Sequence, residues 1–234
     1  MFGTGSSTFT RGPMRKALIP LAATVPAAAM IIHSQAITKH VEELETIPVV
    51  RYRPPSIDQL CEKTKYCRRE LQIMYRAFKQ GCPNGTVLLS EFQDIYTQFF
   101  PQGNTAKYAE LVFRTFDRDN DGIICFEEFV VGLSVISRGT VLEKLEWIFS
   151  LYDICRRGSI GYNELLQVVR SIYELLGSAA MPPVSSSHVR AHVTELFSRM
   201  DRDHDGQITK EEFVEMCQQD EGLCASLALF DTKL

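Results

Sequence analysis

Two stretches of twelve residues carry carboxylates at the same four positions. Each has aspartate at positions 1, 3 and 5, glycine at position 6 and glutamate at position 12. Their acids are Asp117, Asp119, Asp121 and Glu128 in residues 117–128, and Asp201, Asp203, Asp205 and Glu212 in residues 201–212. Three aspartates held this close repel one another unless a cation lies between them. The spacing therefore predicts a metal site in each stretch.

Calcium is the ion that this donor pattern favours. Ca²⁺ takes six to eight oxygen ligands at loose geometry, and the glycine at position 6 makes the turn that gathers the carboxylates. The backbone carbonyl at position 7, of Ile123 in one stretch and Gln207 in the other, is expected to be a further ligand. We predict about two Ca²⁺ per chain, with Mg²⁺ as an alternative ion at the first of these two sites.

A third stretch, residues 80–91, has the glycine but has lost the acids. Gln80, Cys82 and Asn84 stand at positions 1, 3 and 5. Pro83 fixes φ where the chain must curl around an ion. We expect this stretch to be metal-free.

A fourth stretch, residues 153–164, keeps Asp153 and Glu164 at its two ends. Cys155 replaces the ligand at position 3, and Arg157 places a guanidinium at position 5. That group stays charged and would occupy the space meant for the ion. We expect no tight Ca²⁺ binding here, with Arg157 pairing with Glu164 in place of a metal.

The four stretches belong to one internal repeat, in which a helical apolar pattern precedes and follows each loop. A β-branched apolar residue stands two positions after each loop glycine: Val87, Ile124, Ile160 and Ile208. Another apolar residue follows the end of each loop and faces the core: Phe92, Phe129, Leu165 and Phe213. We predict that the first and second loops pair through a short β-bridge, as do the third and fourth.

This repeat predicts an all-α fold with two lobes of paired EF-hands, that is, four helix-loop-helix units. Residues 56–137 would form the N-lobe, with the first hand degenerate and the second able to bind metal. Residues 138–234 would form the C-lobe, with the third hand degenerate, the fourth able to bind metal, and a C-terminal helix. Residues 1–55 would be a variable, flexible tail.

The tail contains an apolar run, residues 17–32, which is interrupted by Pro20 and Pro26. A spanning helix needs about 20 apolar residues, so a transmembrane segment is disfavoured. A signal peptide and a mitochondrial presequence remain alternatives on composition. A further alternative is that the tail contacts a membrane surface. Phe2 stands where N-myristoylation requires a glycine.

Composition narrows the classes of function. The chain of 234 residues is 45% hydrophobic and 23% charged, which is an ordinary globular balance. Its first 41 residues carry four basic residues and no acid, so the rest is more acidic than the net charge of −4. Such a body suits cation binding, and we expect no nucleic-acid partner. Seven cysteines without a CxxC pair indicate free thiols and a cytoplasmic location. Because the sequence has no nucleophile–base pair or phosphate loop, we expect no enzyme.

Large apolar residues are more numerous than two small lobes require. The set consists of Tyr75, Phe78, Ile95, Tyr96, Phe99, Phe100, Phe116, Leu133 and Trp147. We predict that they line a hydrophobic groove for a partner helix, the alternative being that they fill the lobe cores. A last helix near residues 221–230 could cover the groove.

Several segments resemble the neuronal calcium sensor family, and most closely its Kv-channel-interacting protein branch. They are GCPNG in the first loop (81–85), QFFPQG (98–103), RGTVLEKLEWIFSLYDI (138–154) and ALFDTKL (228–234). The resemblance implies an auxiliary subunit of A-type voltage-gated potassium channels. Its groove would take the cytosolic N-terminal segment of the channel. It would then lie in the cytoplasm, peripheral at the plasma membrane, in an oligomer with the channel.

The sequence also departs from that branch. There the third loop normally binds Ca²⁺, whereas Cys155 and Arg157 oppose this here. The second loop there normally ends in aspartate and favours Mg²⁺, whereas Glu128 suits Ca²⁺ better. Three other interpretations stay open: a sensor that regulates a cyclase, kinase or phosphatase, a calcium buffer, and DNA binding, which the resemblance would allow but the acidic body without a basic helix disfavours.

Overall fold

The computed structural model describes residues 55–176 and 185–219. The predicted N-terminal tail up to residue 54, most of the Pro-rich loop between the third and fourth hands, and the predicted last helix lie outside the described residues. Within them the fold is helical, with two short antiparallel strand pairs, as the sequence predicts. None of the described helices is both long and apolar enough to span a bilayer.

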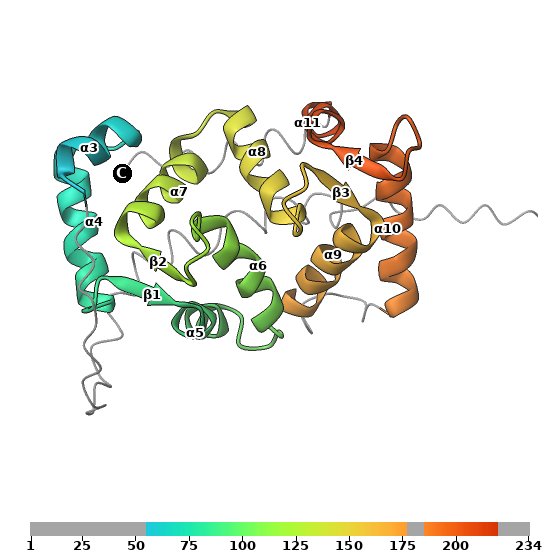
Figure 1. Ribbon diagram of the computed structural model, residues 1–234. Helices are drawn as coiled ribbons and strands as arrows, with labels where there is room; N and C mark the ends of the chain where they lie inside the picture. The colour runs from blue at the N-terminus through green and yellow to red at the C-terminus, as the bar shows by residue number, and fades with distance from the viewer. Residues whose placement is uncertain (1–54, 177–184, 220–234) are drawn as a thin grey trace, which may run out of the picture.

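The first pair of hands is built from residues 68–138 (Figure 1). Its elements are α4 (Arg68–Gly81), β1 (Thr86–Leu88) and α5 (Leu89–Phe99), followed by α6 (Ala106–Phe116), β2 (Ile123–Cys125) and α7 (Phe126–Arg138). A short helix, α3 (Ile57–Lys63), precedes them. The sequence interpretation had no separate helix there, although Ser56 and Gln59 form a capping box at its start.

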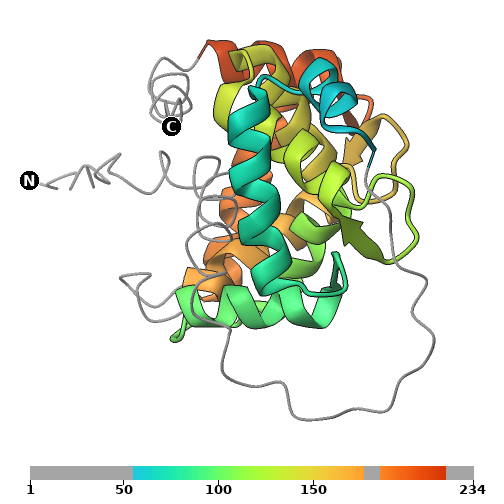
Figure 2. The ribbon, with the colours of Figure 1, turned by 90° about the vertical axis from the view of Figure 1, so that its left-hand side faces the viewer.

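The second pair of hands repeats the arrangement. Its elements are α8 (Val141–Tyr152), β3 (Ser159–Gly161) and α9 (Tyr162–Leu176), followed by α10 (Ser186–Met200), β4 (Gln207–Thr209) and α11 (Lys210–Gln218). In Figure 1 the first pair lies to the left and the second to the right, with α6 and α8 between them. Viewed from the left-hand side, α4 stands upright in front and α5 crosses below it (Figure 2).

The loops pair as predicted. Strand β1 pairs with β2, and β3 pairs with β4. The β-branched residues face one another at the centre of each pair, Val87 opposite Ile124 and Ile160 opposite Ile208. All four are fully buried. The two loops of each pair are thus coupled, because their strands are hydrogen-bonded to each other.

The glutamate that ends each loop also caps the helix that follows. Its carboxylate accepts a hydrogen bond from the backbone N–H at the start of that helix. The pairs are Glu91 with Leu88, Glu128 with Cys125, Glu164 with Gly161, and Glu212 with Thr209. A carboxylate at a helix N-terminus satisfies an otherwise unpaired donor and is favoured by the helix dipole. This second role explains why the metal-free loops still end in glutamate.

The apolar residues form a single core that runs through both pairs of hands. The predicted core positions Phe92, Phe129, Leu165 and Phe213 are all buried. Of the nine predicted groove residues, six are buried: Phe78, Ile95, Tyr96, Phe116, Leu133 and Trp147. Tyr75, Phe99 and Phe100 are partly buried. In this conformation most of the set therefore fills the core, which is the alternative that the sequence left open.

The two pairs of hands touch at the centre of the molecule. Helix α6 packs against both α8 and α9. The loop before α6 reaches the end of α9, where the backbone N–H of Asn104 donates to the carbonyl of Glu174 at 2.8 Å. A Cβ built on the neighbouring Gly103 would lie 1.8 Å from the carbonyl oxygen of Leu175. Glycine permits this close backbone approach because it has no side chain.

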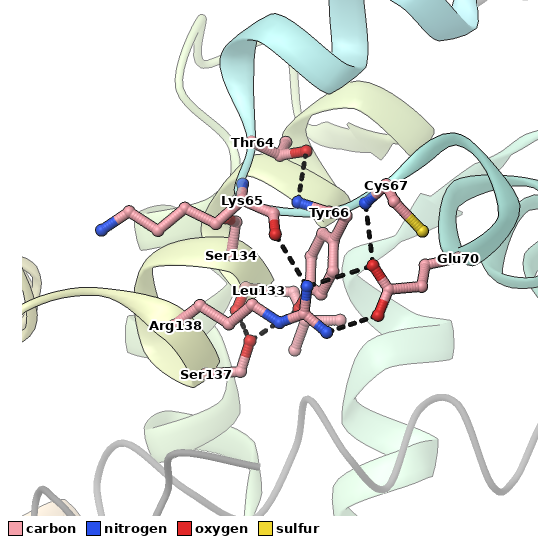
Figure 3. A network of polar contacts seen from close by, with 9 residues as sticks. All are labelled: Thr64, Lys65, Tyr66, Cys67, Glu70, Leu133, Ser134, Ser137 and Arg138. Atoms are coloured by element: carbon pink, nitrogen blue, oxygen red, sulfur yellow. Dashed lines mark hydrogen bonds and ion pairs between the residues drawn. The ribbon is translucent and has the colours of Figure 1, made fainter. Parts of the chain in front are cut away.

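A polar network fastens the turn between α3 and α4 to the end of α7 (Figure 3). Arg138 donates to both carboxylate oxygens of Glu70 and, at 2.7 Å, to the carbonyl of Lys65. Its guanidinium also lies over the ring of Tyr66, 4.5 Å from the ring centroid. The Tyr66 hydroxyl bonds to Ser137 at 2.6 Å. These contacts join segments about 70 residues apart and fix where the first hand begins.

The network predicts a pH dependence of stability. The hydrogen bond from Arg138, together with the backbone N–H of Cys67, lowers the pKa of Glu70 to about 2. Because the folded-state pKa is depressed, the stabilisation is present above the unfolded value of 4.5 and is lost as pH falls towards 2. In urea unfolding, we expect Glu70→Gln to cost about 1 kcal/mol at pH 7, and the gap from the wild type to narrow below pH 4.5 and to close only as the pH falls through about 2. A gap that stayed constant with pH would contradict this role.

Candidate metal centres

The second loop gathers its acids around a turn with the backbone of an ion-binding loop. Gly122 has a φ of 85° and Asn120 a φ of 59°, both in the left-handed region. The N–H of Gly122 donates to Asp117 at 3.1 Å, and the N–H of Ile123 donates to Asp121 at 2.9 Å. The turn is thus held by hydrogen bonds from its own backbone to the aspartates.

The structure brings together three of the four predicted side-chain ligands of the second loop. One carboxylate oxygen from each of Asp117, Asp119 and Glu128 lies within 4.8 Å of the others. Asp121 is not in this group; one of its oxygens accepts the Ile123 N–H, and the residue is exposed. Ile123 stands at the start of β2, where a role for its carbonyl as a ligand stays a prediction.

The fourth loop repeats this geometry. Gly206 has a φ of 84° and His204 a φ of 60°. Carboxylate oxygens of the three aspartates lie within 4.8 Å of one another: Asp201, Asp203 and Asp205. Glu212 is outside the group; the N–H and the hydroxyl of Thr209 both donate to its Oε2, at 2.9 and 2.8 Å. Gln207 begins β4, and its carbonyl as a ligand likewise stays a prediction.

A buried, unpartnered oxygen in each loop shows that a cation fits there. Asp117 and Asp201 are each 5% exposed, and their Oδ2 atoms accept from the loop glycines. Their Oδ1 atoms are buried without a hydrogen-bond partner. A carboxylate oxygen that is removed from water and left unpaired costs free energy, and a bound metal ion supplies the missing partner.

In the third loop, the first aspartate has hydrogen-bond partners for both carboxylate oxygens without a metal. Both oxygens of Asp153 are bonded, Oδ1 to the N–H of Arg157 at 2.9 Å and Oδ2 to the N–H of Gly158 at 2.7 Å. The guanidinium of Arg157 donates to Glu164 at 2.6 Å, which confirms the predicted pair. Burial of the Glu164 carboxyl opposes its ionisation, but donors from Gly161, Cys155 and Arg157 hold its pKa below the usual value.

The first loop is closed by a residue that the sequence interpretation missed. The ammonium of Lys79, in the last turn of α4, donates to the carbonyl of Pro83 inside the loop. Gly85 keeps the positive φ of 85°, but Pro83 stands at the position where the other three loops have a left-handed residue. Burial raises the pKa of the Cys82 thiol to about 12, so it stays protonated and is a poor metal ligand.

The residues at position 4 of the second, third and fourth loops adopt a left-handed backbone, which the sequence interpretation did not predict. Asn120 and His204 occupy the left-handed position 4, and asparagine and histidine are among the side chains enriched in that conformation. Arg156 occupies the same position in the third loop, with a φ of 53°. Its contacts, described below, could not be read from local sequence because they reach across to the second loop.

Comparison with known families matches two parts of the chain. A model described as an EF hand domain matches residues 109–136, which include the whole second loop. A model described as an EF-hand domain pair matches residues 142–218, which include the third and fourth loops. Helices, paired loops and acid clusters agree with both matches. The chain therefore contains EF-hand domains, the helix-loop-helix domains typical of calcium-binding regulatory proteins.

Proposed function

We propose that this protein is a calcium sensor that binds one Ca²⁺ in its second loop and one in its fourth. The observation that carries the proposal is the contrast between the first aspartates of the three acidic loops. Asp117 and Asp201 each keep a buried oxygen without a partner, whereas both oxygens of Asp153 are bonded within its own loop. Two loops thus need a cation and one does not.

The residues divide the work at each site. When bound, Ca²⁺ supplies two positive charges to carboxylates that otherwise repel one another. The ligands proposed are the acids at positions 1, 3, 5 and 12 and the carbonyl at position 7: Asp117, Asp119, Asp121, Ile123 and Glu128, with Asp201, Asp203, Asp205, Gln207 and Glu212. Asp121 and Glu212, which stand apart from the gathered groups, have to turn inward to complete their shells.

A sensor is favoured over a buffer because the sites are tied to the core. Glu128 and Glu212 belong both to the loops and to the first turns of α7 and α11. Because each carboxylate also caps its helix, an ion that the carboxylate binds is coupled to the position of that helix. The next residues, Phe129 and Phe213, are buried in the shared core. Metal binding is expected to shift these helices and expose apolar surface that is now buried.

We propose that the exposed surface takes the cytosolic N-terminal segment of an A-type voltage-gated potassium channel. This makes the protein an auxiliary subunit at the cytoplasmic face of the plasma membrane. The support is the sequence resemblance over the four segments named above. The burial of most predicted groove residues adds a condition, namely that the core must open before a partner helix can enter.

The test combines a dye with a peptide. We expect Ca²⁺ to raise the fluorescence of a dye that binds apolar surface, and to strengthen binding of a peptide with the channel's N-terminal sequence. The chain carrying both Glu128→Gln and Glu212→Gln is the control and should do neither. Ca²⁺ uptake without a dye response would indicate a buffer. A dye response without peptide binding would indicate a sensor for another target, such as a cyclase, kinase or phosphatase.

A further inference from the structure

Two arginines cross between the second and third loops in opposite directions. Arg156, from the metal-free third loop, donates through Nη2 to the carbonyls of Arg114 at 3.0 Å and Asp117 at 3.2 Å. Arg114, near the end of α6, donates through Nη2 to the carbonyl of Ile154 in the third loop at 2.6 Å. We call this pair of contacts the arginine clasp. It joins a proposed calcium site in the first pair of hands to a loop of the second pair.

Asp117 belongs both to the arginine clasp and to the proposed calcium site. It is the C-cap of α6, and its side chain is the first acid of the second loop. The last carbonyls of a helix lack partners within the helix, and a cation beside them is favoured by the helix dipole. By holding the Asp117 carbonyl, Arg156 fixes the backbone from which the unpartnered Asp117 Oδ1 projects.

The third loop is a suitable platform for this contact because it keeps its shape without a metal. The ion pair between Arg157 and Glu164 and the bonds to Asp153 close it from within. Arg156 sits at the left-handed position 4 of that loop, and its exposed side chain reaches the second loop from there.

We propose that Arg156 is a positioning residue for the calcium site of the second loop, and that the arginine clasp links binding there to the order of the third loop. The proposal rests on Ca²⁺ binding by the second loop, the function proposed above. The positive charge of Arg156 also repels Ca²⁺. This repulsion weakens binding, whereas the hydrogen bond to the Asp117 carbonyl favours it. Because Arg156 is exposed, water and salt weaken that repulsion, whereas the hydrogen bonds act directly on Asp117.

The affinity of the second loop tests the proposal. The full chain is used with Glu212→Gln, so that calorimetry reports the second loop alone. Arg156→Asn removes the guanidinium but tolerates the left-handed backbone, and we expect it to weaken Ca²⁺ binding about fivefold. Arg156→Lys keeps the positive charge but has a single nitrogen as donor, so its Ca²⁺ affinity should lie between those of Arg156→Asn and the wild type. Arg170→Gln, which removes another exposed arginine, on α9, should leave the affinity unchanged.

The variants are expected to fold. Arg114 and Arg156 line an open cleft of about 510 Å³, so shortening Arg156 leaves no hole in the core. Thermal unfolding in a calcium chelator should confirm that Arg156→Asn and Arg170→Gln differ little in stability. A loss of affinity seen together with matched stability then reflects positioning and not unfolding.

Hydrogen exchange tests the link to the third loop. With Glu212→Gln as background, Ca²⁺ should slow exchange of the Cys155 and Arg157 amides, and this protection should disappear with Arg156→Asn. Unchanged or tighter Ca²⁺ binding by Arg156→Asn would overturn the positioning role, the tighter result meaning that charge repulsion dominates. If the Glu212→Gln chain bound no Ca²⁺ even with Arg156 intact, the second-loop site itself would be refuted.

Discussion

Glu128→Gln and Glu212→Gln are each expected to remove one of two Ca²⁺ ions measured by calorimetry on the wild-type chain. A glutamine offers one neutral oxygen where the glutamate offers two charged ones, so the affinity of the altered loop should fall by roughly two orders of magnitude. The variants should still fold without metal, because glutamine can also close the capping box at the start of α7 or α11.

The first loop offers a matched control for these variants. Glu91 holds the same loop position and caps α5 in the same way, but its loop is closed by Lys79 and Pro83. Glu91→Gln should therefore change neither the number of ions nor their affinities. If calorimetry gave three ions for the wild type, the interpretation of the third loop would be wrong. If Glu91→Gln removed an ion, the first loop would have been misjudged.

Joint replacement of Cys155 and Arg157 by aspartate is expected to create a third Ca²⁺ site. The double substitution removes the guanidinium that now pairs with Glu164 and restores acids at positions 3 and 5. Gly158 and Arg156 already have the backbone conformation of the metal loops. Ca²⁺ binding to this loop should rise from undetectable to at least the 10⁻⁵ M range typical of sensor loops, which calorimetry would show as one added ion.

The same double variant should be less stable than the wild type without Ca²⁺ and more stable than the wild type with it. Without metal, four carboxylates would crowd the loop, so its melting temperature in a chelator should lie below that of the wild type. Saturating Ca²⁺ should more than reverse the loss, since a ligand that binds only the folded state stabilises it by mass action. Cys155→Ser with Arg157→Gln is the control, which should lose the ion pair and gain no ion. A Ca²⁺-induced rise in melting temperature no larger than that of the wild type, whose second and fourth loops also bind Ca²⁺, would contradict the prediction.

Local sequence was sufficient for the parts of the fold and site that depend on residues close together in the chain. The fixed offsets from Asp117 to Glu128 and from Asp201 to Glu212 identified the two acidic loops, because an EF-hand loop draws its ligands from twelve consecutive residues. The β-branched residues two positions after each loop glycine, Val87, Ile124, Ile160 and Ile208, predicted the strand pairing because the internal repeat gives every loop the same position, and the register confirms it.

Tertiary structure decided what depends on distant residues. It placed Phe116, Leu133 and Trp147 in one core and not in an open groove, a choice that depends on how the two pairs of hands pack. It also decided that Arg138 meets Glu70, and that Arg156 reaches the carbonyl of Asp117, 39 residues away. No spacing rule in the sequence encodes such contacts, because they arise only when separate helices are brought together. The sequence by itself determined which loops can hold an ion, and the packing determined what each loop is attached to.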